Sequence, residues 1–224
     1  MLSFRLARVP VRIHFFFFLT AAMLAGGRPG PLLISWLVVV FVSVMVHEFG
    51  HALMGRAFGL VPEIDLHGMG GTTSWTAGRP LGPGPHILIS LAGPFAGLAL
   101  GAVVWAASGS VATTALSKAI VSQLIWVNVA WGAVNLIPML PLDGGNVMAR
   151  TLDALTGGRG RKPAHVVSAL IAVAIIGYVL ATGGLTALLA GNVGAAWPAI
   201  LATLFLVQNV RALMPPPEDR DAES

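Results

Sequence analysis

Long uncharged apolar stretches, separated by short polar segments, dominate this chain and predict a helical protein that crosses a membrane several times. An α-helix needs about 20 apolar residues to span a bilayer. The expected spans are residues 13–27, 32–55, 86–108, 118–137, 164–182 and 195–213. The first span is short and follows three arginines, as in a signal peptide, but further spans follow it and we expect a retained helix. Gly93 and Pro94 predict a kink or a break in the third span.

The segment between the second and third spans has a different pattern, with charges, prolines and many glycines. Val61–Leu66 and Thr72–Thr76 read as two short strands around a glycine-rich turn. The fold class is therefore an α-helical polytopic membrane protein of about six transmembrane helices, with a small membrane-associated β-hairpin between the second and third.

Two further segments complete the predicted organisation. Residues 142–156 follow two prolines and are expected to form a short helix. The polar end of the chain, residues 215–224, is expected to be a disordered cytoplasmic tail. Residues 1–214 would then form a single membrane domain.

Composition supports this class and narrows the chemistry. Of the 224 residues 56% are hydrophobic and only 10% are charged, whereas soluble domains carry about 25% charged residues. The net charge of +4 comes from basic residues that flank the apolar segments, which is unlike a nucleic-acid-binding patch. There is no cysteine, so disulfides and thiolate ligands are excluded. A metal ion would need His, Asp, Glu or water.

The distribution of basic residues predicts the topology. With six spans and a cytoplasmic N-terminus, 11 of the 13 Lys and Arg residues fall in cytoplasmic segments, and the outer loops hold only Arg28 and Lys118. This bias agrees with the positive-inside rule. We therefore expect a multi-pass protein of the cell membrane with both termini in the cytoplasm and the end of the second span at the cytoplasmic surface.

An H-E-x-x-H sequence lies near the end of that second span. His47 and His51 are four residues apart, so a helix places both imidazoles on one face, and Glu48 lies beside them. Such a pair can bind one metal ion while the glutamate acts as a base. The preceding residues, Leu32–Val46, carry no charge. A purely structural role is disfavoured because each polar group is costly in lipid. At about 1.5 Å per residue, the metal would lie roughly 7–14 Å below the surface marked by Arg56.

Two histidines leave a catalytic zinc site one protein ligand short. Asp143 is the best candidate among the acidic residues, because it follows a segment broken by prolines and precedes two glycines that allow a close backbone approach. A helix-capping role for Asp143 is the alternative. Asn135 could position a substrate or stabilise an oxyanion, or it could satisfy backbone groups freed by Pro138. Asn128 is expected to form a hydrogen bond between helices.

Two motifs together resemble the site-2 protease family of intramembrane zinc metalloproteases (M50 type). The first is His47-Glu48-Phe49-Gly50-His51. The second is Asn135-Leu136-Ile137-Pro138-Met139-Leu140-Pro141-Leu142-Asp143-Gly144-Gly145, which matches the pattern N-x-x-P-x-x-P-L-D-G-G. Leu91-Ala92-Gly93-Pro94 and the glycine-rich hairpin ending in Gly70-Gly71 are also similar to the family. The resemblance covers roughly residues 10–155.

The resemblance implies a mechanism and a class of substrate. His47, His51 and Asp143 would bind Zn²⁺, and Glu48 would take a proton from the attacking water and return it to the leaving amine. The substrates would be single-pass membrane proteins, cleaved near the cytoplasmic face as in regulated intramembrane proteolysis. A substrate helix must unwind first, and the predicted hairpin offers an edge for an extended peptide.

Two other functions remain open at this point. Intramembrane His and Glu also form ion pathways, which would make the protein a metal transporter. However, residues 86–137 contain no acidic residue. The other alternative is a membrane protein that binds zinc only for structure, but such a site does not need Glu48. His67 and His86 flank the hairpin segment and could touch a substrate, but solvated loop histidines are the favoured explanation.

Overall fold

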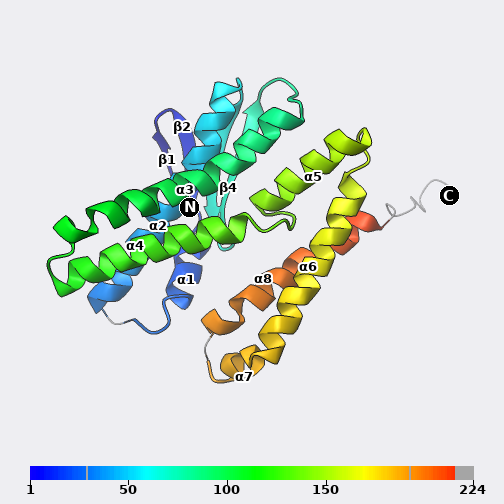
Figure 1. Cartoon of the computed structure of the whole chain (residues 1–224). Coiled ribbons are helices and arrows are strands. Elements are labelled where there is room, and N and C mark those ends of the chain that lie inside the picture. The colour runs from blue at the N-terminus through cyan, green and yellow to red at the C-terminus, as the bar shows by residue number, and fades with distance from the viewer. Residues whose placement is uncertain (29, 192, 215–224) are drawn as a thin grey trace, which may run out of the picture.

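The computed structural model describes residues 1–28, 30–191 and 193–214, so the predicted tail at 215–224 lies outside the described residues. Helices and a small sheet alternate along the chain (Figure 1). Their bounds are β1 Leu2–Leu6, β2 Val9–Ile13, α1 Phe15–Met23, α2 Gly30–Ala57, β3 Val61–His67, β4 Gly70–Ala77, α3 Pro83–Val111, α4 Ala115–Asn135, α5 Asp143–Thr156, α6 Arg161–Ala181, α7 Gly184–Leu189 and α8 Val193–Leu213.

Within the described residues, four helices are long and apolar enough to cross a membrane, namely α2, α3, α6 and α8. Helix α4 has 21 residues but carries Gln123 and Asn128, which lower its hydropathy. Both side chains are buried and reach serines of α2. The hydroxyl of Ser35 donates to Gln123 over 3.1 Å, and the amide of Asn128 donates to Ser43 over 2.9 Å. The expectation of an interhelical hydrogen bond at Asn128 is confirmed.

The expectation of one continuous helix over residues 13–27 is wrong. Helix α1 has nine residues and extends about 14 Å, half of a bilayer core. The preceding residues form β2, in which Val9, Val11 and Ile13 are buried while the residues between them are more exposed. This period of two is the pattern of a strand rather than a helix. The strand is only five residues long and directly precedes a run of four phenylalanines, which masks its alternation in the sequence.

The sheet is larger than the single hairpin that the sequence predicts. Its order is β1-β2-β3-β4, with antiparallel outer pairs and a parallel central pair in which Arg12 lies opposite Asp65. The Arg12 guanidinium donates to Asp65 over 2.7 Å and to Glu63 over 2.6 Å. These ion pairs join residues that are 53 and 51 positions apart in sequence, which local pattern does not reveal.

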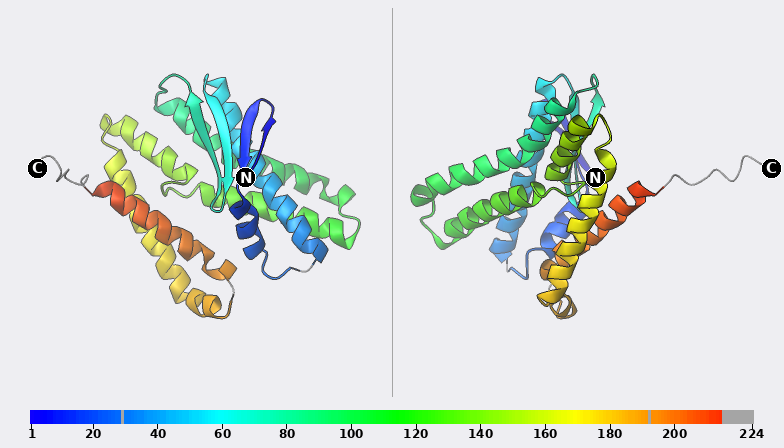
Figure 2. Two further views of the ribbon diagram at one scale, coloured as in Figure 1. Left: turned by 180° about the vertical axis from the view of Figure 1, so that it is seen from behind. Right: turned by 45° about the vertical axis from the view of Figure 1, so that its right-hand side comes forward.

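The sheet packs on the C-terminal half of α2, and it lies in front of that helix in the view from behind (Figure 2). Side chains of the sheet, of α2 and of α1 form one buried core, consisting of Val9, Val11, Ile13, Phe17, Val44, Met45, Ala52, Ile64 and Leu66. At the other end of the contact, the Arg56 guanidinium donates to the carbonyl of Ala7, 2.9 Å away. The sheet is therefore fixed beside the turn of α2 that carries the H-E-x-x-H motif.

The remaining helices form two groups. Helices α2, α3 and α4 pack together, and α6 and α8 form a separate pair that is seen beside them in both figures. Helix α5 packs against α3 on one side and α6 on the other, so it lies at the junction of the two groups. Helix α3 continues through Pro94, so this residue does not break the helix, and the alternative of a kink there stays a prediction.

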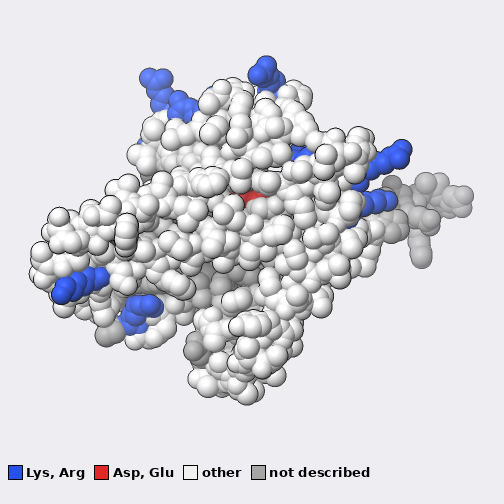
Figure 3. Space-filling view, viewed as in Figure 1, with Lys and Arg blue, Asp and Glu red and all other residues white. Residues whose placement is uncertain are grey.

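Lysine and arginine side chains avoid the middle of the face drawn in Figure 3. On the face drawn in Figure 3, the blue Lys and Arg atoms lie at the periphery, and only a small red area is visible near the centre. White marks all other residues, and many large apolar side chains of the helices are exposed. Such a surface suits contact with lipid and supports a multi-pass membrane protein.

Candidate metal centre

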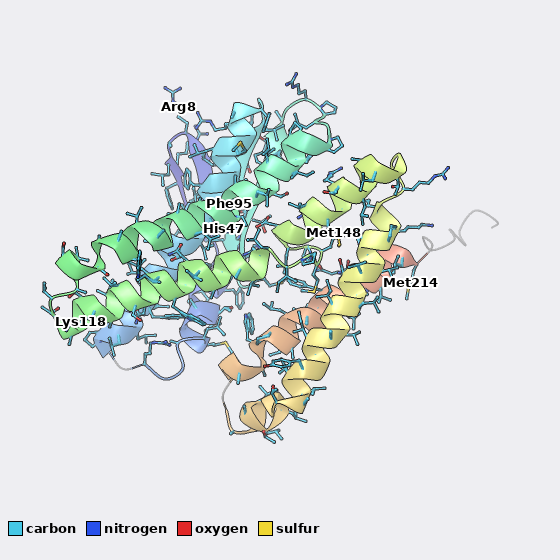
Figure 4. All side chains as sticks on the ribbon, in the orientation of Figure 1. Arg8, His47, Phe95, Lys118, Met148 and Met214 are labelled. Atoms are coloured by element: carbon cyan, nitrogen blue, oxygen red, sulfur yellow. The ribbon has the colours of Figure 1, made fainter. Side chains whose placement is uncertain are left out.

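Helix α2 presents three polar side chains to the interior of the protein. His47, Glu48 and His51 are only 3%, 4% and 7% exposed, although each is ionisable. Figure 4 shows His47 near the middle of the molecule, far from the labelled Lys118 and Met214 at its ends. Buried charges of this kind are tolerated when they are paired or bind a metal.

Asp143 reaches the same place from the other group of elements. It is the first residue of α5, directly after the irregular segment 136–142. Gly144 and Gly145 make this approach possible, because a side chain at either position would overlap the backbone of residues 136–140. Asn146 holds the entry to the helix by donating to the carbonyls of Pro141 and Leu142 over 3.1 and 3.2 Å.

The three side chains bring their ligand atoms together. His47 Nε2 lies 3.2 Å from His51 Nε2 and 3.1 Å from Asp143 Oδ2, and His51 Nε2 lies 3.4 Å from Asp143 Oδ1. Tetrahedral zinc with bonds of about 2.0–2.1 Å separates its ligand atoms by roughly 3.3 Å. In the described part of the chain, this is the only group of at least three His, Asp or Glu residues whose ligand atoms lie close enough to hold one metal ion. The donor set and its spacing fit a zinc ion.

The orientation of His51 also suits a metal ligand. Its Nδ1 lies 2.7 Å from the carbonyl of Ile89 in α3, which can only accept, so Nδ1 carries the proton. The lone pair is then on Nε2, the atom that faces His47 and Asp143. A second partner that fixes the tautomer in this way is usual for zinc-bound histidine. The Nδ1 atom of His47, by contrast, is buried without a hydrogen-bond partner among the described residues.

Glu48 is held by the edge strand of the sheet. The hydroxyl of Thr73 in β4 donates to Glu48 Oε2 over 2.7 Å. Gly71 lies against the same carboxylate, and a Cβ atom there would come within 2.5 Å of Oε1. Sequence reasoning did not single out Thr73. The alternation along β4, which places Gly71 and Thr73 on one face, was the available signal.

A cavity of about 720 Å³ opens beside these residues and lies between the two groups of helices. Its wall includes Asn135, His67 at the end of β3 and His86 near the start of α3. An amide hydrogen of Asn135 is donated to the carbonyl of Trp131, one turn earlier in α4, over 2.9 Å. Asn135 is partly exposed to the cavity, and its bonded carbonyl belongs to its own helix.

Gly93 is the residue that gives His51 its space. A Cβ atom at Gly93 would overlap the imidazole at Nε2, whereas one at Gly97, a turn further along α3, would come no closer than 3.5 Å to Asn128. We expect Gly93→Ala to displace His51 and weaken zinc binding at least about tenfold, a loss within the range found when ligand orientation is disturbed. Gly97→Ala is the matched control and should bind zinc as the wild type does. Competition titration with a chromophoric chelator measures both, and equal affinities would contradict the packing described.

Comparisons with known proteins point to one family. The model of the peptidase family M50 matches residues 107–179. A relative from Synechocystis is 31% identical over 187 residues, which are 83% of this chain and 48% of the relative. Rip3 of Mycobacterium tuberculosis is 32% identical over 198 residues, covering 81% of this chain and 48% of that protein. Both carry names of the zinc metalloprotease class. The chain spans about half the length of these curated relatives.

A solved structure shares the fold. The site-2 protease from Methanocaldococcus jannaschii superposes with a TM-score of 0.65 and 22% identity, covering 96% of this chain and 95% of that one. Fold and site together define a multi-pass membrane metalloprotein with a buried His-His-Asp group. The chain belongs to peptidase family M50, the site-2 protease family.

Proposed function

We propose that the protein is a zinc-dependent intramembrane endopeptidase that cleaves transmembrane helices of single-pass membrane proteins near the cytoplasmic face. The observation that carries the proposal is the position of Glu48. Its carboxylate is buried beside the His47, His51 and Asp143 group, at the wall of a cavity of about 720 Å³. A site that held zinc only for structure would not need this carboxylate at a cavity.

The chemistry follows from these positions. His47, His51 and Asp143 would hold the ion, and zinc when bound supplies a Lewis acid that polarises the scissile carbonyl and lowers the pKa of water. Glu48 accepts a proton from the attacking water and delivers it to the leaving amine. Thr73 donates to one oxygen of this carboxylate, and the absence of a side chain at Gly71 lets the other oxygen lie close to β4.

The topology proposed for this activity keeps both termini in the cytoplasm, with residues 1–214 as one membrane domain. Helices α2, α3, α6 and α8 are four of the crossings, and α4 is the fifth, with its polar residues turned towards α2. For the first crossing we propose β2 followed by α1, since strand and helix run on from each other at His14. Arg56, at the C-terminal end of α2, donates to Ala7 in the basic turn that precedes β2. The start of β2 and the end of α2 therefore lie together, and we propose that both face the cytoplasm, in agreement with the positive-inside rule.

The function is tested by reconstituting the full chain in lipid vesicles with a membrane-spanning peptide. We expect cleavage within the spanning segment that is lost on removal of zinc by a chelator and restored by added zinc. A zinc-sensitive dye inside the vesicles measures transport in the same sample. Zinc flux without any cleavage would reject the peptidase and favour a transporter.

Strand β4 is proposed to bind the unwound substrate. It is an edge strand of the sheet, it lines the cavity through Gly71, Thr72, Thr73 and Trp75, and it contacts Glu48. An extended peptide that added to this edge would form backbone hydrogen bonds from every second residue. N-methylation of single substrate amides near the cleavage site should therefore slow cleavage with a period of two residues. A set of rates that shows no alternation would reject strand addition.

The same mode of binding can be tested on the enzyme side. Disruption of the β3–β4 hairpin between Ile64 and Trp75 should impair cleavage while zinc stays bound, because the metal ligands lie on α2 and α5. Unchanged cleavage by such a variant would count against a role of the hairpin in substrate binding. Zinc content, measured by elemental analysis of the purified variant, is the control.

Asn135 is proposed to hold the substrate or its oxyanion through its amide. We expect Asn135→Leu to lower kcat by about 10²-fold, the size of effect found when one such donor is removed, with zinc content unchanged. Steady-state cleavage of the spanning peptide gives kcat and KM separately. If kcat stays at the wild-type value, the bond to the Trp131 carbonyl is the main role of Asn135.

A further inference from the structure

The segment that leads to Asp143 is bound at both backbone polar groups of one residue, Leu140, by the last two long helices. The backbone N–H of Leu140 donates to the hydroxyl of Ser168 in α6, 2.8 Å away. The carbonyl of Leu140 accepts from the amide of Asn209 in α8, also at 2.8 Å. Ser168 is 0% exposed and Asn209 is 1% exposed. Two fully buried polar side chains are thus used on a single residue of an irregular segment.

Both side chains are themselves held in place. The Ser168 hydroxyl donates to the carbonyl of Ala164 over 2.7 Å, and Asn209 also donates to the carbonyl of Phe205 over 2.8 Å. The Oδ1 atom of Asn209 lies 2.8 Å from His165 Nδ1. Met139, next to Leu140, is buried in the apolar core that α6 and α8 share. The segment is therefore fixed by packing as well as by hydrogen bonds.

The position of Asp143 depends on this segment. The carboxylate of Asp143 has hydrogen-bond or ion-pair contacts only with His47 and His51 among the described residues, so its place is set by its backbone. Asp143 follows Leu140 by only three residues. The first turn of α5 also touches the backbone at Leu140 directly, because a Cβ atom at Gly145 would overlap Leu140 N. A shift of the Leu140 backbone would therefore move Asp143.

We propose that Ser168 and Asn209 are positioning residues for the metal ligand Asp143, and that His165 orients Asn209. Helices α6 and α8 have no extensive packing against α2, α3 or α4 among the described residues. They affect the position of Asp143 through their hydrogen bonds to the backbone of Leu140 and through α5. The last two helices therefore set the spacing between Asp143 and the two histidines of α2.

The experiment compares purified full-length variants in detergent. Asn209→Leu keeps the size of the side chain and removes its donor, and Ser168→Ala removes one hydroxyl. The controls are Thr203→Ala in α8 and Thr182→Ala at the end of α6, whose hydroxyls donate only to carbonyls of their own helices. For each protein we would measure the thermal unfolding midpoint, the zinc affinity by chelator competition, the visible spectrum of the Co²⁺ form, and kcat for a spanning peptide.

The expected result is a loss of zinc affinity of about 10–100-fold in Asn209→Leu and a smaller loss in Ser168→Ala, as for other groups that orient metal ligands. The Co²⁺ bands of both variants should differ from those of the wild type, and kcat should fall with little change in KM. The double variant should lose less than the product of the two single effects, because both act on the backbone of one residue, Leu140. Both controls should behave as the wild type.

Several outcomes would overturn the proposal. Wild-type zinc affinity and Co²⁺ bands in folded Asn209→Leu and Ser168→Ala would reject it, even if kcat fell, and so would equal losses in the controls. If Asn209→Leu does not fold, Ser168→Ala decides the question alone. Only the kcat measurement rests on the proposed function. If the wild type cleaves no peptide, the peptidase assignment fails, while zinc affinity and the Co²⁺ spectrum still test the positioning role.

Discussion

Glu48→Gln is expected to reduce cleavage of a membrane-spanning peptide by at least about 10³-fold, within the range that a general base contributes. Glutamine keeps the shape of the side chain and still accepts the hydrogen bond that Thr73 donates to Glu48. It cannot take a proton from water. The change therefore removes the base and leaves the packing of α2 against β4 in place. Cleavage is measured by mass spectrometry of the released fragments in vesicles.

Zinc content separates this result from a loss of the metal. His47, His51 and Asp143 are untouched, so Glu48→Gln should bind zinc as tightly as the wild type. Glu63→Gln is the matched control, because Glu63 lies on β3 and contacts Arg12 rather than the metal centre. Its activity should stay near the wild-type value. Cleavage that persists in Glu48→Gln would contradict the proposed mechanism.

Asp143→Asn is expected to weaken zinc binding by more than the roughly 10–100-fold that is lost when only a supporting group is removed. Asparagine has the size of aspartate but no charge, so the site would keep two neutral imidazoles and a poor third ligand. Cleavage should fall in parallel, because the metal is absent at ordinary zinc concentrations. Chelator competition gives the affinity, and added zinc should restore part of the activity.

The control for this variant lies on the same helix. Asp153 is in α5, where its Oδ1 accepts from the backbone N–H of Gly160 over 2.9 Å. Asp153→Asn keeps that acceptor and should bind zinc like the wild type. If Asp143→Asn retained full zinc affinity, Asp143 would be a capping residue rather than a ligand, which is the alternative that the sequence left open.

Some parts of the fold were within reach of the sequence. The spans at α2, α3, α6 and α8 follow from uncharged stretches of sufficient length, since only a helix satisfies its backbone within lipid. The short helix α5 follows from the break at Pro138 and Pro141. The first segment was not predicted, because Val9 to Ile13 is too short to show its strand period clearly beside a longer apolar run. Its strand pairs with β3, about 50 residues away.

The candidate site also has features that the sequence predicts and features that only the tertiary structure reveals. The sequence by itself determined the chemical groups: two imidazoles one helical turn apart, a carboxylate beside them, and an aspartate behind two prolines. Motif spacing fixes these because residues four apart on a helix share a face. The tertiary structure decided what surrounds them. Thr73 at Glu48, Ile89 at His51 and the hold of α6 and α8 on Leu140 are contacts between distant segments, and no local period or motif specifies which side chains meet once the helices and the sheet have packed.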